Sequence, residues 1–590
     1  MKERRLTITF ALGLGLTLAV LLSLFICPPS LSRAANITSV NTTNDGIVAG
    51  DGQCTLREAI NNANADSDTT GGDCMAGSGD DTISLGAGTY VLTLTGAVED
   101  FNSTGDLDLT GTHALTIAGL GANQTIINAG GIDRVLHVFS GTVVITGVAI
   151  AGGNTDQYGG GLYNATADLT LINVLVFSNS ARYGGGIYVA AGNTTLIGVD
   201  VISNSGRYDG GGLYVSLGRV TLTATDFVSN TAASDGGGVG VGDGQITMEG
   251  GEIYNNTASD EGGGIMVDET PAHVVLTGTR IISNSAQDYG GGIYAAQGQV
   301  TLSGVQLLSN TAGYLGGGAS VGSSGGALTI TANSLIAYNR VTDPAVGYGG
   351  GGLALDSSTA QLTVQDSQIL SNVAHWGGGG VFVTGGNARL ERVAVVGNRA
   401  FVGGGINHSH YYASSALAII NSTVSQNRAV SGGSGGGIYA DQNTTTALTF
   451  TTVASNTATG GGPIGGGLHL VPGATLLIQN SLVAYNMVSA TARNCSPGIT
   501  STGYNLDSAN TCGFAATGDI TNTNPLLDAL AEENDTRVHP LLADSPAIDK
   551  GLCVAGIATD QRGQSRPDFG CDIGAYEVGG AEVYLPIIQR

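Results

Sequence analysis

Two markers that repeat in phase along the middle of this chain constrain its fold most strongly. Twelve glycine triplets recur at steps of 25 to 34 residues, and most steps are 25 to 28. An asparagine that ends an apolar run recurs with the same period, so the segment is an array of equivalent units. The triplets begin at Gly159, Gly184, Gly210, Gly236, Gly262, Gly290, Gly316, Gly350, Gly378, Gly403, Gly435 and Gly465, and the asparagines are Asn179, Asn204, Asn230, Asn256, Asn284, Asn310, Asn339, Asn372, Asn398, Asn427, Asn456 and Asn486.

Each unit contains three short segments that are typical of β-strands. In the unit that starts at Gly290 they are GGIYA, QVTLSG and VQLLSN, rich in β-branched and aliphatic residues and bounded by Gly, Asn or Ser. No segment has the length or composition of a repeated helix, which disfavours a leucine-rich repeat, and a propeller needs longer units of four strands. The sequence therefore predicts an all-β fold, a single-stranded parallel β-helix with three short strands per coil.

This geometry explains both markers. Coils stack about 4.8 Å apart, so equivalent residues form ladders along the axis. An inward asparagine can bond to its neighbours above and below, which satisfies polar groups that would otherwise cost about 1–3 kcal/mol each. Glycine permits positive φ and a close backbone passage where a Cβ would clash. Inward aliphatic residues such as Ile293, Val300, Leu302, Val305 and Leu307 are expected to form the core.

The two ends of the array need caps, because an open coil exposes strand edges and core. In CTLREAINNANAD, Thr55 and Glu58 are placed as a capping box, which predicts a short amphipathic helix over the first coil. Six cysteines lie outside the array, and neighbour pairing is the favoured one of several connectivities. These local pairs are Cys54 with Cys74, Cys495 with Cys512, and Cys553 with Cys571.

The first 34 residues are typical of an export signal. Basic Lys2, Arg4 and Arg5 precede a long apolar run, and small residues lead to Ala34; an uncleaved anchor helix is the alternative. Cleavage would leave 17 basic and 45 acidic residues, which disfavours nucleic acid and anionic membrane surfaces as partners. We expect a secreted or bacterial cell-surface protein with no transmembrane span after cleavage.

Both ends resemble known families. DGQCTLREAINNANAD followed by GDDTISLGAGTYVLT resembles the CSLREA domain of exported bacterial right-handed β-helix proteins, with Thr55 where the family name has Ser. DSPAIDKG followed by TDQRGQSRPDFGCDIGAYE resembles the conserved end of choice-of-anchor Q proteins. The motifs cover residues 51–93 and 524–577. The resemblance implies right-handed coiling, export and surface association, and it implies no activity.

Six segments follow from these patterns. The final one ends in VYLPIIQR, without an LPxTG motif, and is either a sorting tag or a last strand. The segments are a signal peptide (1–34), an N-terminal cap (35–81), opening coils (82–158), Gly/Asn-marked coils (159–494), an irregular C-terminal cap (495–577) and a tail (578–590).

Aromatic residues flank the glycine triplets and predict a strip of outward rings along the coils. Rings stacked at coil spacing suit sugars, through apolar contact and hydroxyl bonds. The alternative is that tyrosine packs on exposed strands and turns, where its propensity is high. The glycan-binding candidates are Tyr158, Tyr183, Tyr208, Tyr289, Tyr314, Tyr348 and Trp376 before the triplets, and Tyr163, Tyr188, Tyr214 and Tyr294 after them; Phe401, Phe382 and Tyr439 occupy the same positions.

A second candidate ladder is acidic and spans four adjacent coils. Like charges about 5 Å apart repel, so either water screens them or Ca²⁺ bridges them. We state calcium as a hypothesis and solvated turns as the alternative; no cofactor is required. The residues are Asp209, Asp235, Asp260, Glu261 and Asp288.

Catalysis is the less favoured function. β-Elimination needs a basic residue beside acidic calcium ligands, and hydrolysis needs clustered carboxylates on a strand face. Neither pattern occurs within the repeats. The favoured function is therefore adhesion or carbohydrate binding by an exported, surface-associated, non-catalytic protein that contacts polysaccharide or cell-surface glycan. The alternatives are a polysaccharide lyase or glycoside hydrolase of the pectate-lyase-like β-helix type, and a passive surface spacer.

Overall fold

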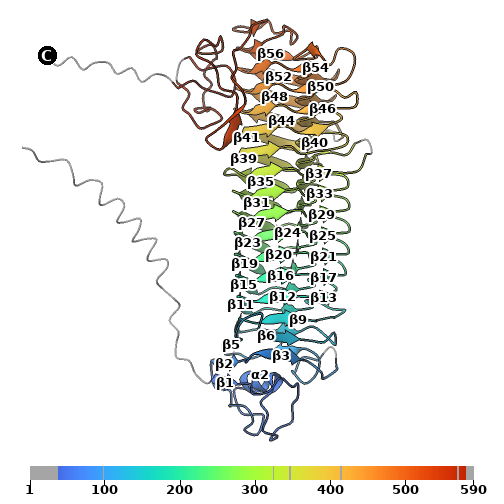
Figure 1. The fold of residues 1–590 in the computed structure, drawn as a ribbon, viewed down its shortest axis with the longest axis vertical. Helices are drawn as coiled ribbons and strands as arrows, with labels where there is room; N and C mark the ends of the chain where they lie inside the picture. Colours follow the sequence, from blue (N-terminus) through green and yellow to red (C-terminus); the bar gives the residue numbers. More distant parts are fainter. Residues whose placement is uncertain are drawn as a thin grey trace, which may run out of the picture.

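A computed structural model describes residues 37–96, 99–322, 325–344, 347–411, 415–567 and 570–579. The expected signal peptide lies outside the described residues, as does all but the start of the expected tail. The described chain is a long column of stacked coils, with the N-terminal helix at one end (Figure 1). Within it, no helix is long and apolar enough to cross a bilayer.

The coils pair in parallel, as the repeat predicts, and form three faces. A 32-stranded sheet (sheet A) and a 14-stranded sheet (sheet B) run along the column, and short 7-stranded and 5-stranded sheets (sheet C) form the third face. The strands of sheet B are β4 (Leu107–Leu109), β7 (Leu136–Val138), β10 (Leu162–Asn164), β14 (Ile187–Val189), β18 (Leu213–Val215), β22 (Val239–Val241), β26 (Ile265–Val267), β30 (Ile293–Ala295), β34 (Ala319–Val321), β38 (Leu353–Leu355), β40 (Val381–Val383), β43 (Ile406–His408), β47 (Ile438–Ala440) and β51 (Leu468–Leu470).

One coil illustrates the unit. β30 belongs to sheet B, and β31 (Gln299–Ser303) and β32 (Gln306–Leu308) belong to sheet A. These are the three strands that the sequence predicts. A further strand of two residues, β33 (Thr311–Ala312), follows the asparagine and contributes to sheet C.

The core lies inside the coils, where the aliphatic side chains stack. All five residues predicted to point inward in this coil are buried, with at most 1% of their surface exposed. Strand β31 alternates buried Val300 and Leu302 with more exposed neighbours. Full burial of each such side chain contributes about 1.5–3 kcal/mol, so the array is stabilised coil by coil.

The asparagine ladder is confirmed. Asn310 Nδ2 donates to Asn339 Oδ1 at 3.0 Å and to the Ile281 carbonyl at 2.9 Å. Asn310 Oδ1 accepts from the backbone N–H of Asn284 at 2.9 Å and from its Nδ2 at 3.0 Å. The same bonds run from Asn179 to Asn486, and the last asparagine donates to Asn494. Every side chain of the ladder is thereby satisfied inside the column.

The glycine triplets turn the chain where neighbouring coils nearly touch. Gly290 has a φ of +62°, which L side chains rarely adopt. A Cβ on Gly291 would lie 2.4 Å from the carbonyl carbon of Thr311 in the next coil. Both reasons predicted for glycine therefore apply at this turn.

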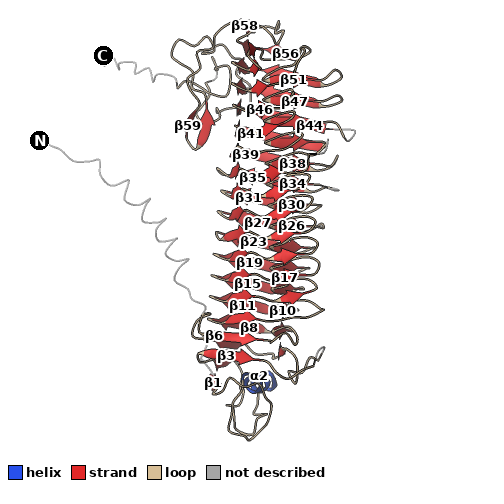
Figure 2. Ribbon diagram, turned by 45° about the vertical axis from the view of Figure 1, so that its right-hand side comes forward, coloured by secondary structure: helices blue, strands red, loops and turns tan. Residues whose placement is uncertain are grey.

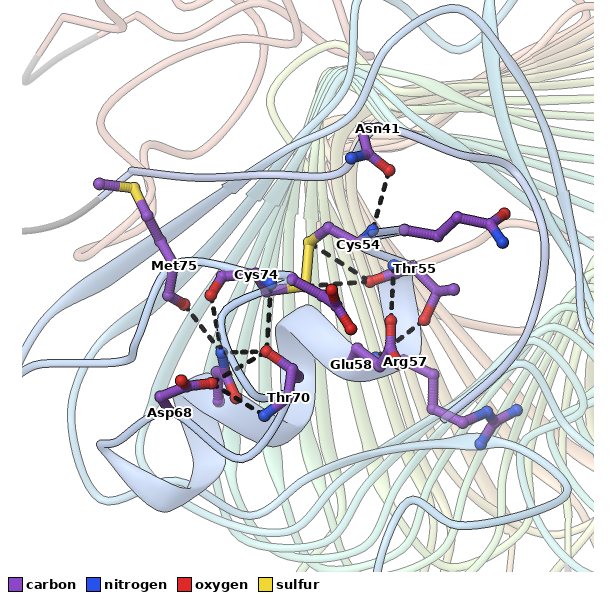
Figure 3. The surroundings of a disulfide bond; sticks show 12 residues. Asn41, Cys54, Thr55, Arg57, Glu58, Asp68, Thr70, Cys74 and Met75 are labelled. Carbon is purple, nitrogen blue, oxygen red and sulfur yellow. Dashed lines mark hydrogen bonds between the residues drawn. A yellow bond between two sulfur atoms is a disulfide. The ribbon is translucent and has the colours of Figure 1, made fainter. Parts of the chain in front are cut away.

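The N-terminal cap is built by the CTLREA segment. Helix α2 (Leu56–Ala65) begins with the predicted capping box: Thr55 Oγ1 accepts from Glu58 N at 3.1 Å, and Glu58 Oε2 accepts from Thr55 N at 3.0 Å. Figure 3 shows this turn beside the disulfide between Cys54 and Cys74. These residues hold the helix over the first coil.

Arg57 fixes the loop that leads into β4. Its side chain is fully buried and pairs with Asp45 at 2.8 Å. It also donates to the backbone carbonyls of Gly105 at 2.8 Å and Asp106 at 2.7 Å. The arginine of the motif is therefore a structural clamp.

The C-terminal cap has two parts. Residues 495–523 close the column with the disulfide between Cys495 and Cys512 and with β56 (Thr500–Gly503), β57 (Leu506–Asp507) and β58 (Ile520–Thr521). Residues 524–567 and 570–579, here the lateral lobe, fold back beside the column (Figures 1 and 2). The lobe contains the hairpin β59 (Ala531–Glu533) and β60 (Thr536–Val538) and the disulfide between Cys553 and Cys571.

The lateral lobe covers apolar and polar groups on the outer face of sheet A. Leu530 packs against a cluster that includes Leu370 of β39 (Gln361–Leu370) and Val396 of β41 (Gly386–Val396). The lobe also bonds to sheet A through Thr423 Oγ1, which donates to Gln561 Oε1 at 2.7 Å. The C-terminal cap therefore covers part of the side of the column as well as its end.

Candidate functional site

The central residues of the sheet B strands form one aligned row outside the core. In β14, Ile187 and Val189 lie in the core, whereas Tyr188 between them does not. The parallel register continues this row along the whole sheet, and we name it the central row. Its members are Asp108, His137, Tyr163, Tyr188, Tyr214, Gly240, Met266, Tyr294, Ser320, Ala354, Phe382, Asn407, Tyr439 and His469.

The residues before the glycine triplets lie beside this row in two different registers. Tyr158 pairs with Tyr183, and Tyr289 pairs with Leu315, directly before their triplets. The aromatic candidates in other coils stand one residue earlier in the chain. The two sets still meet in space, since the ring of Tyr208 stacks on that of Tyr183 with centroids 5.3 Å apart. The earlier set is Tyr208, Tyr314, Tyr348, Trp376 and Phe401.

The rings make clusters with an interruption between them. In the first cluster, centroids of adjacent rings lie 4.7 to 6.2 Å apart. In the second, the separations are 4.5 to 6.0 Å, and Trp376 stacks on Phe401 at 4.8 Å as a further pair. The first cluster comprises Tyr158, Tyr163, Tyr183, Tyr188, Tyr208 and Tyr214; the second comprises Tyr289, Tyr294, Tyr314 and Tyr348.

Exposure differs strongly among these rings. Tyr208 is 47% exposed, whereas Tyr188 and Tyr294 are only 9% and 5% exposed. Neighbouring rings and turns cover the two buried tyrosines, although both lie outside the core. The aromatic residues therefore form the floor and wall of an interrupted groove instead of the uniform outward strip that the sequence predicts.

Carboxylates occupy the interruption between the ring clusters. Burial and the nearby Asp235 carboxylate raise the pKa of Asp209 to about 6. The carboxylates also accept from backbone amides of the next coil, as Asp235 Oδ1 does from Glu261 N at 2.8 Å. Among the described residues, no three of the five calcium candidates gather within 4.8 Å of one another. The structure therefore does not assemble the predicted ligand set.

Glu261 should make stability depend on pH. Burial and the carboxylates of Asp235, Asp260, Asp268 and Asp288 raise the pKa of Glu261 to about 8. Because the folded state retains this proton longer than the unfolded state, its contribution to stability falls as the pH rises from about 4.5 to about 8. Glu261→Gln should therefore raise the melting temperature of the protein at pH 9 relative to wild type, and not at pH 4.

Melting curves of the two proteins across this pH range test the expectation. Solvent screening limits the gain to about 1–2 kcal/mol. Glu249→Gln, on the exposed end of β23 (Gln245–Glu249), is the matched control and should leave the pH profile unchanged. Parallel profiles for wild type and Glu261→Gln would contradict the assignment.

Four members of the central row carry buried polar atoms that lack a hydrogen-bond partner within the described protein. These atoms are Asp108 Oδ1, Ser320 Oγ, Asn407 Oδ1 and His469 Nδ1. An unmet buried polar group costs about 1–3 kcal/mol, so such atoms mark places where a ligand can complete the bonding. The sequence analysis did not identify these atoms, because their residue types do not repeat from coil to coil.

Two cavities open on the central row. One of about 540 Å³ is lined by residues that include Glu261, Tyr289, Tyr294, Ser320 and Asp356. Another of about 490 Å³, at the N-terminal end of the row, is lined by residues that include Asp106, Arg134, His137, Tyr158 and Tyr163. The row thus combines rings, unpaired polar atoms and space for a ligand.

Asp106, Arg134 and His137 line the N-terminal cavity, and Asp108 pairs in register with His137 beside it. Burial raises the pKa of Asp106 to about 8 and the pKa of Asp108 to about 7. Burial and the neighbouring Arg134 guanidinium lower the pKa of His137 to about 3. Arg134 Nε lies 3.4 Å from Asp106 Oδ2. None of these four residues was a candidate in the sequence, where the isolated histidines, His137 among them, show no metal-ligand spacing.

The fold is a right-handed parallel β-helix, with ring clusters and two separate cavities along sheet B. Residues 159–335 match the family model described as "Right handed beta helix region". A solved structure, the crystal structure of pectate lyase Pel9A, aligns with 14% identity over 92% of this chain and 98% of that chain, with a TM-score of 0.26. At that identity and score, the likeness says nothing about activity. No curated protein matches the chain.

Proposed function

We propose that this protein is a non-catalytic carbohydrate-binding β-helix protein whose glycan lies along the central row of sheet B. One observation carries the proposal: a single aligned row combines stacked rings with buried polar atoms that lack partners, such as Ser320 Oγ and Asn407 Oδ1. Sugars present apolar ring faces and many hydroxyl groups, which match these two kinds of surface.

The spacing of the rings supports an extended ligand. Tyr183 and Tyr208 have centroids 5.3 Å apart, and Tyr188 and Tyr214 have centroids 5.5 Å apart. These separations follow the stacking of the coils, so within a cluster each successive coil offers one more ring of the same kind. A chain of sugars could contact several coils in succession, with the carboxylates around Glu261 between the two ring clusters.

Export and surface association form part of the proposal. Two disulfides lie at the two ends of the column and a third lies in the lateral lobe, and disulfides persist in oxidising compartments. The resemblance of the ends to CSLREA and choice-of-anchor Q proteins supports the same location. We retain the six-segment organisation, from a signal peptide at 1–34 to a tail at 578–590, as part of this proposal.

A glycan panel tests the proposal. Wild-type protein should be retained by at least one polysaccharide without shortening it. Tyr183→Ser combined with Tyr208→Ser should weaken binding about tenfold or more, since each aromatic contact contributes about 0.5–1.5 kcal/mol. Tyr254→Ser is the control, because this tyrosine is 41% exposed on β24 (Glu252–Tyr254) of sheet A, away from the groove.

The same panel separates the alternatives. Release of shorter oligosaccharides would identify a polysaccharide lyase or hydrolase. Absence of retention by every glycan would favour a passive spacer. Equal weakening by Tyr254→Ser and by the paired groove substitutions would place the binding surface elsewhere.

A further inference from the structure

The first two strands of sheet B bring three potential metal ligands together. Asp108 at the centre of β4 pairs in register with His137 at the centre of β7. His137 Nδ1 lies 3.6 Å from Asp108 Oδ1 and 3.8 Å from Asp100 Oδ1. These three atoms all lie within 4.8 Å of one another, the only such group of three or more His, Cys, Asp or Glu residues in the part of the chain that the structure describes.

Asp108 presents an unsatisfied atom to this group. Its side chain has 0% exposure. Oδ2 accepts from the backbone N–H of Asn102 at 2.8 Å, whereas Oδ1 has no hydrogen-bond partner among the described residues. A buried carboxylate oxygen without a hydrogen-bond donor is costly, so Oδ1, which faces His137, is available to bind a cation.

The imidazole nitrogen that faces Asp108 carries a lone pair. Arg134 Nη1 lies 3.2 Å from His137 Nδ1, and a guanidinium can only donate. Nδ1 is therefore the acceptor in this contact, and it faces the equally electron-rich Oδ1 of Asp108. Two acceptors that face each other repel unless a proton or a metal cation lies between them.

The surrounding cap holds the ligands in place. Arg57 donates to the Gly105 and Asp106 carbonyls, and Asn102 Nδ2 donates to the Arg57 carbonyl at 3.0 Å. These bonds fix the loop that carries Asp100 and leads into β4. Fixed outer contacts of this kind orient metal ligands, so the CTLREA cap doubles as the scaffold of the site.

We propose that Asp100, Asp108 and His137 bind a divalent first-row transition-metal ion of the zinc class. An imidazole nitrogen with two carboxylates suits such an ion, whereas Ca²⁺ prefers oxygen ligands alone. Zinc bonds of about 2.0–2.2 Å in a tetrahedral site separate ligand atoms by roughly 3.4 Å. The distances of 3.6 and 3.8 Å therefore need only a small closure.

Metal binding at His137 Nδ1 requires the Arg134 guanidinium to move away from this nitrogen. Arg134 has two other groups nearby that it can contact instead. Its Nε lies 3.4 Å from Asp106 Oδ2, and its guanidinium carbon lies 5.4 Å from the centroid of Tyr163. The side chain of Asp100 is 62% exposed, so the group is open to an incoming ion. The remaining coordination positions would face the cavity of about 490 Å³.

Titration of the metal-free full chain with Zn²⁺ tests the site, with Ca²⁺ as the comparison ion. Zn²⁺ should bind one ion per chain and raise the melting temperature, and Ca²⁺ should do neither. Asp108→Asn and His137→Gln should each weaken Zn²⁺ binding about tenfold to a hundredfold. His113→Gln, on a histidine whose side chain is 49% exposed near the same end of the protein, should leave binding unchanged.

X-ray absorption of the wild-type protein loaded with one equivalent of Zn²⁺ gives a measurement that needs no variant. Nitrogen and oxygen ligands with imidazole scattering are expected. Absence of imidazole scattering, unchanged Zn²⁺ affinity in Asp108→Asn, or failure of the wild-type protein to bind Zn²⁺ would each overturn the proposal. Failure of the glycan-binding test of the proposed function would leave this metal-site proposal standing, because the metal titration contains no glycan.

Discussion

Asn310→Ala will open the coils around it and lower the free energy of unfolding by about 4 kcal/mol or more. The substitution removes the donor to Asn339 Oδ1 and to the Ile281 carbonyl. It also leaves the backbone N–H of Asn284 without its acceptor and removes one of the two acceptors of Asn284 Nδ2. Each unmet buried group costs about 1–3 kcal/mol, and these costs fall on adjacent coils that contact only their neighbours.

Urea unfolding followed by hydrogen exchange measures this loss and its location. Exchange should increase first in the coils of Asn284, Asn310 and Asn339. Asn193→Ala is the matched control, because this asparagine is exposed on β15 (Asn193–Ile197) and its side chain bonds to Asp168 at the surface. Its effect should stay within about 0.5 kcal/mol. Equal unfolding midpoints for the two variants would mean that the ladder contributes no stability.

Arg566→Met will release the lateral lobe from the column. The Arg566 side chain is 1% exposed, pairs with Glu577 at 2.6 Å and donates to the Gly574 carbonyl at 2.7 Å. It also reaches Asn421 Oδ1 on the column at 3.1 Å and lies 4.0 Å from the centroid of Phe450. Removal of one partner of a buried ion pair costs about 3–5 kcal/mol, because the other charge is left unpaired.

Limited proteolysis and hydrogen exchange distinguish release of the lobe from unfolding of the column. Cleavage should concentrate in residues 524–579, while the asparagine ladder stays protected. Arg537→Met is the control within the same lobe, since its ion pair with Glu532 spans 3.6 Å and both side chains are more than a third exposed. A column that loses protection together with the lobe would contradict a local role for Arg566.

This network also gives the C-terminal motif a structural explanation. Arg562 pairs with Asp560 at 2.8 Å and with Glu533 at 2.7 Å, and both Arg562 and Asp560 belong to the TDQRGQSRPDFGCDIGAYE segment. Together with Arg566, these residues hold the lobe and join it to sheet A. The charged residues of the segment therefore maintain the fold, as Arg57 does at the other end.

The candidate site was only partly predictable from the sequence. The candidate rings are indeed brought together, but the sequence could not tell which rings stack across coils, as Tyr183 does on Tyr208. It also could not predict that Tyr188 and Tyr294 are covered. The metal-ligand group left a weak signal: LDL around Asp108 and LHV around His137 match the apolar–polar–apolar centre of the sheet B strands, without the glycine triplets that reveal the later coils.

The sequence by itself determined the coil, its three main strands, the asparagine ladder and the capping helix, because each depends on a period or on neighbours within a few residues. Only the tertiary structure decided which unrepeated side chains face one another. Asp108 meets His137 across two coils, and the lateral lobe returns to cover Leu370 far back along the chain. Because coils stack in register, residues that repeat along the sequence become neighbours in space. Contacts between segments that do not repeat depend on the paths of the loops, which the repeat pattern does not specify.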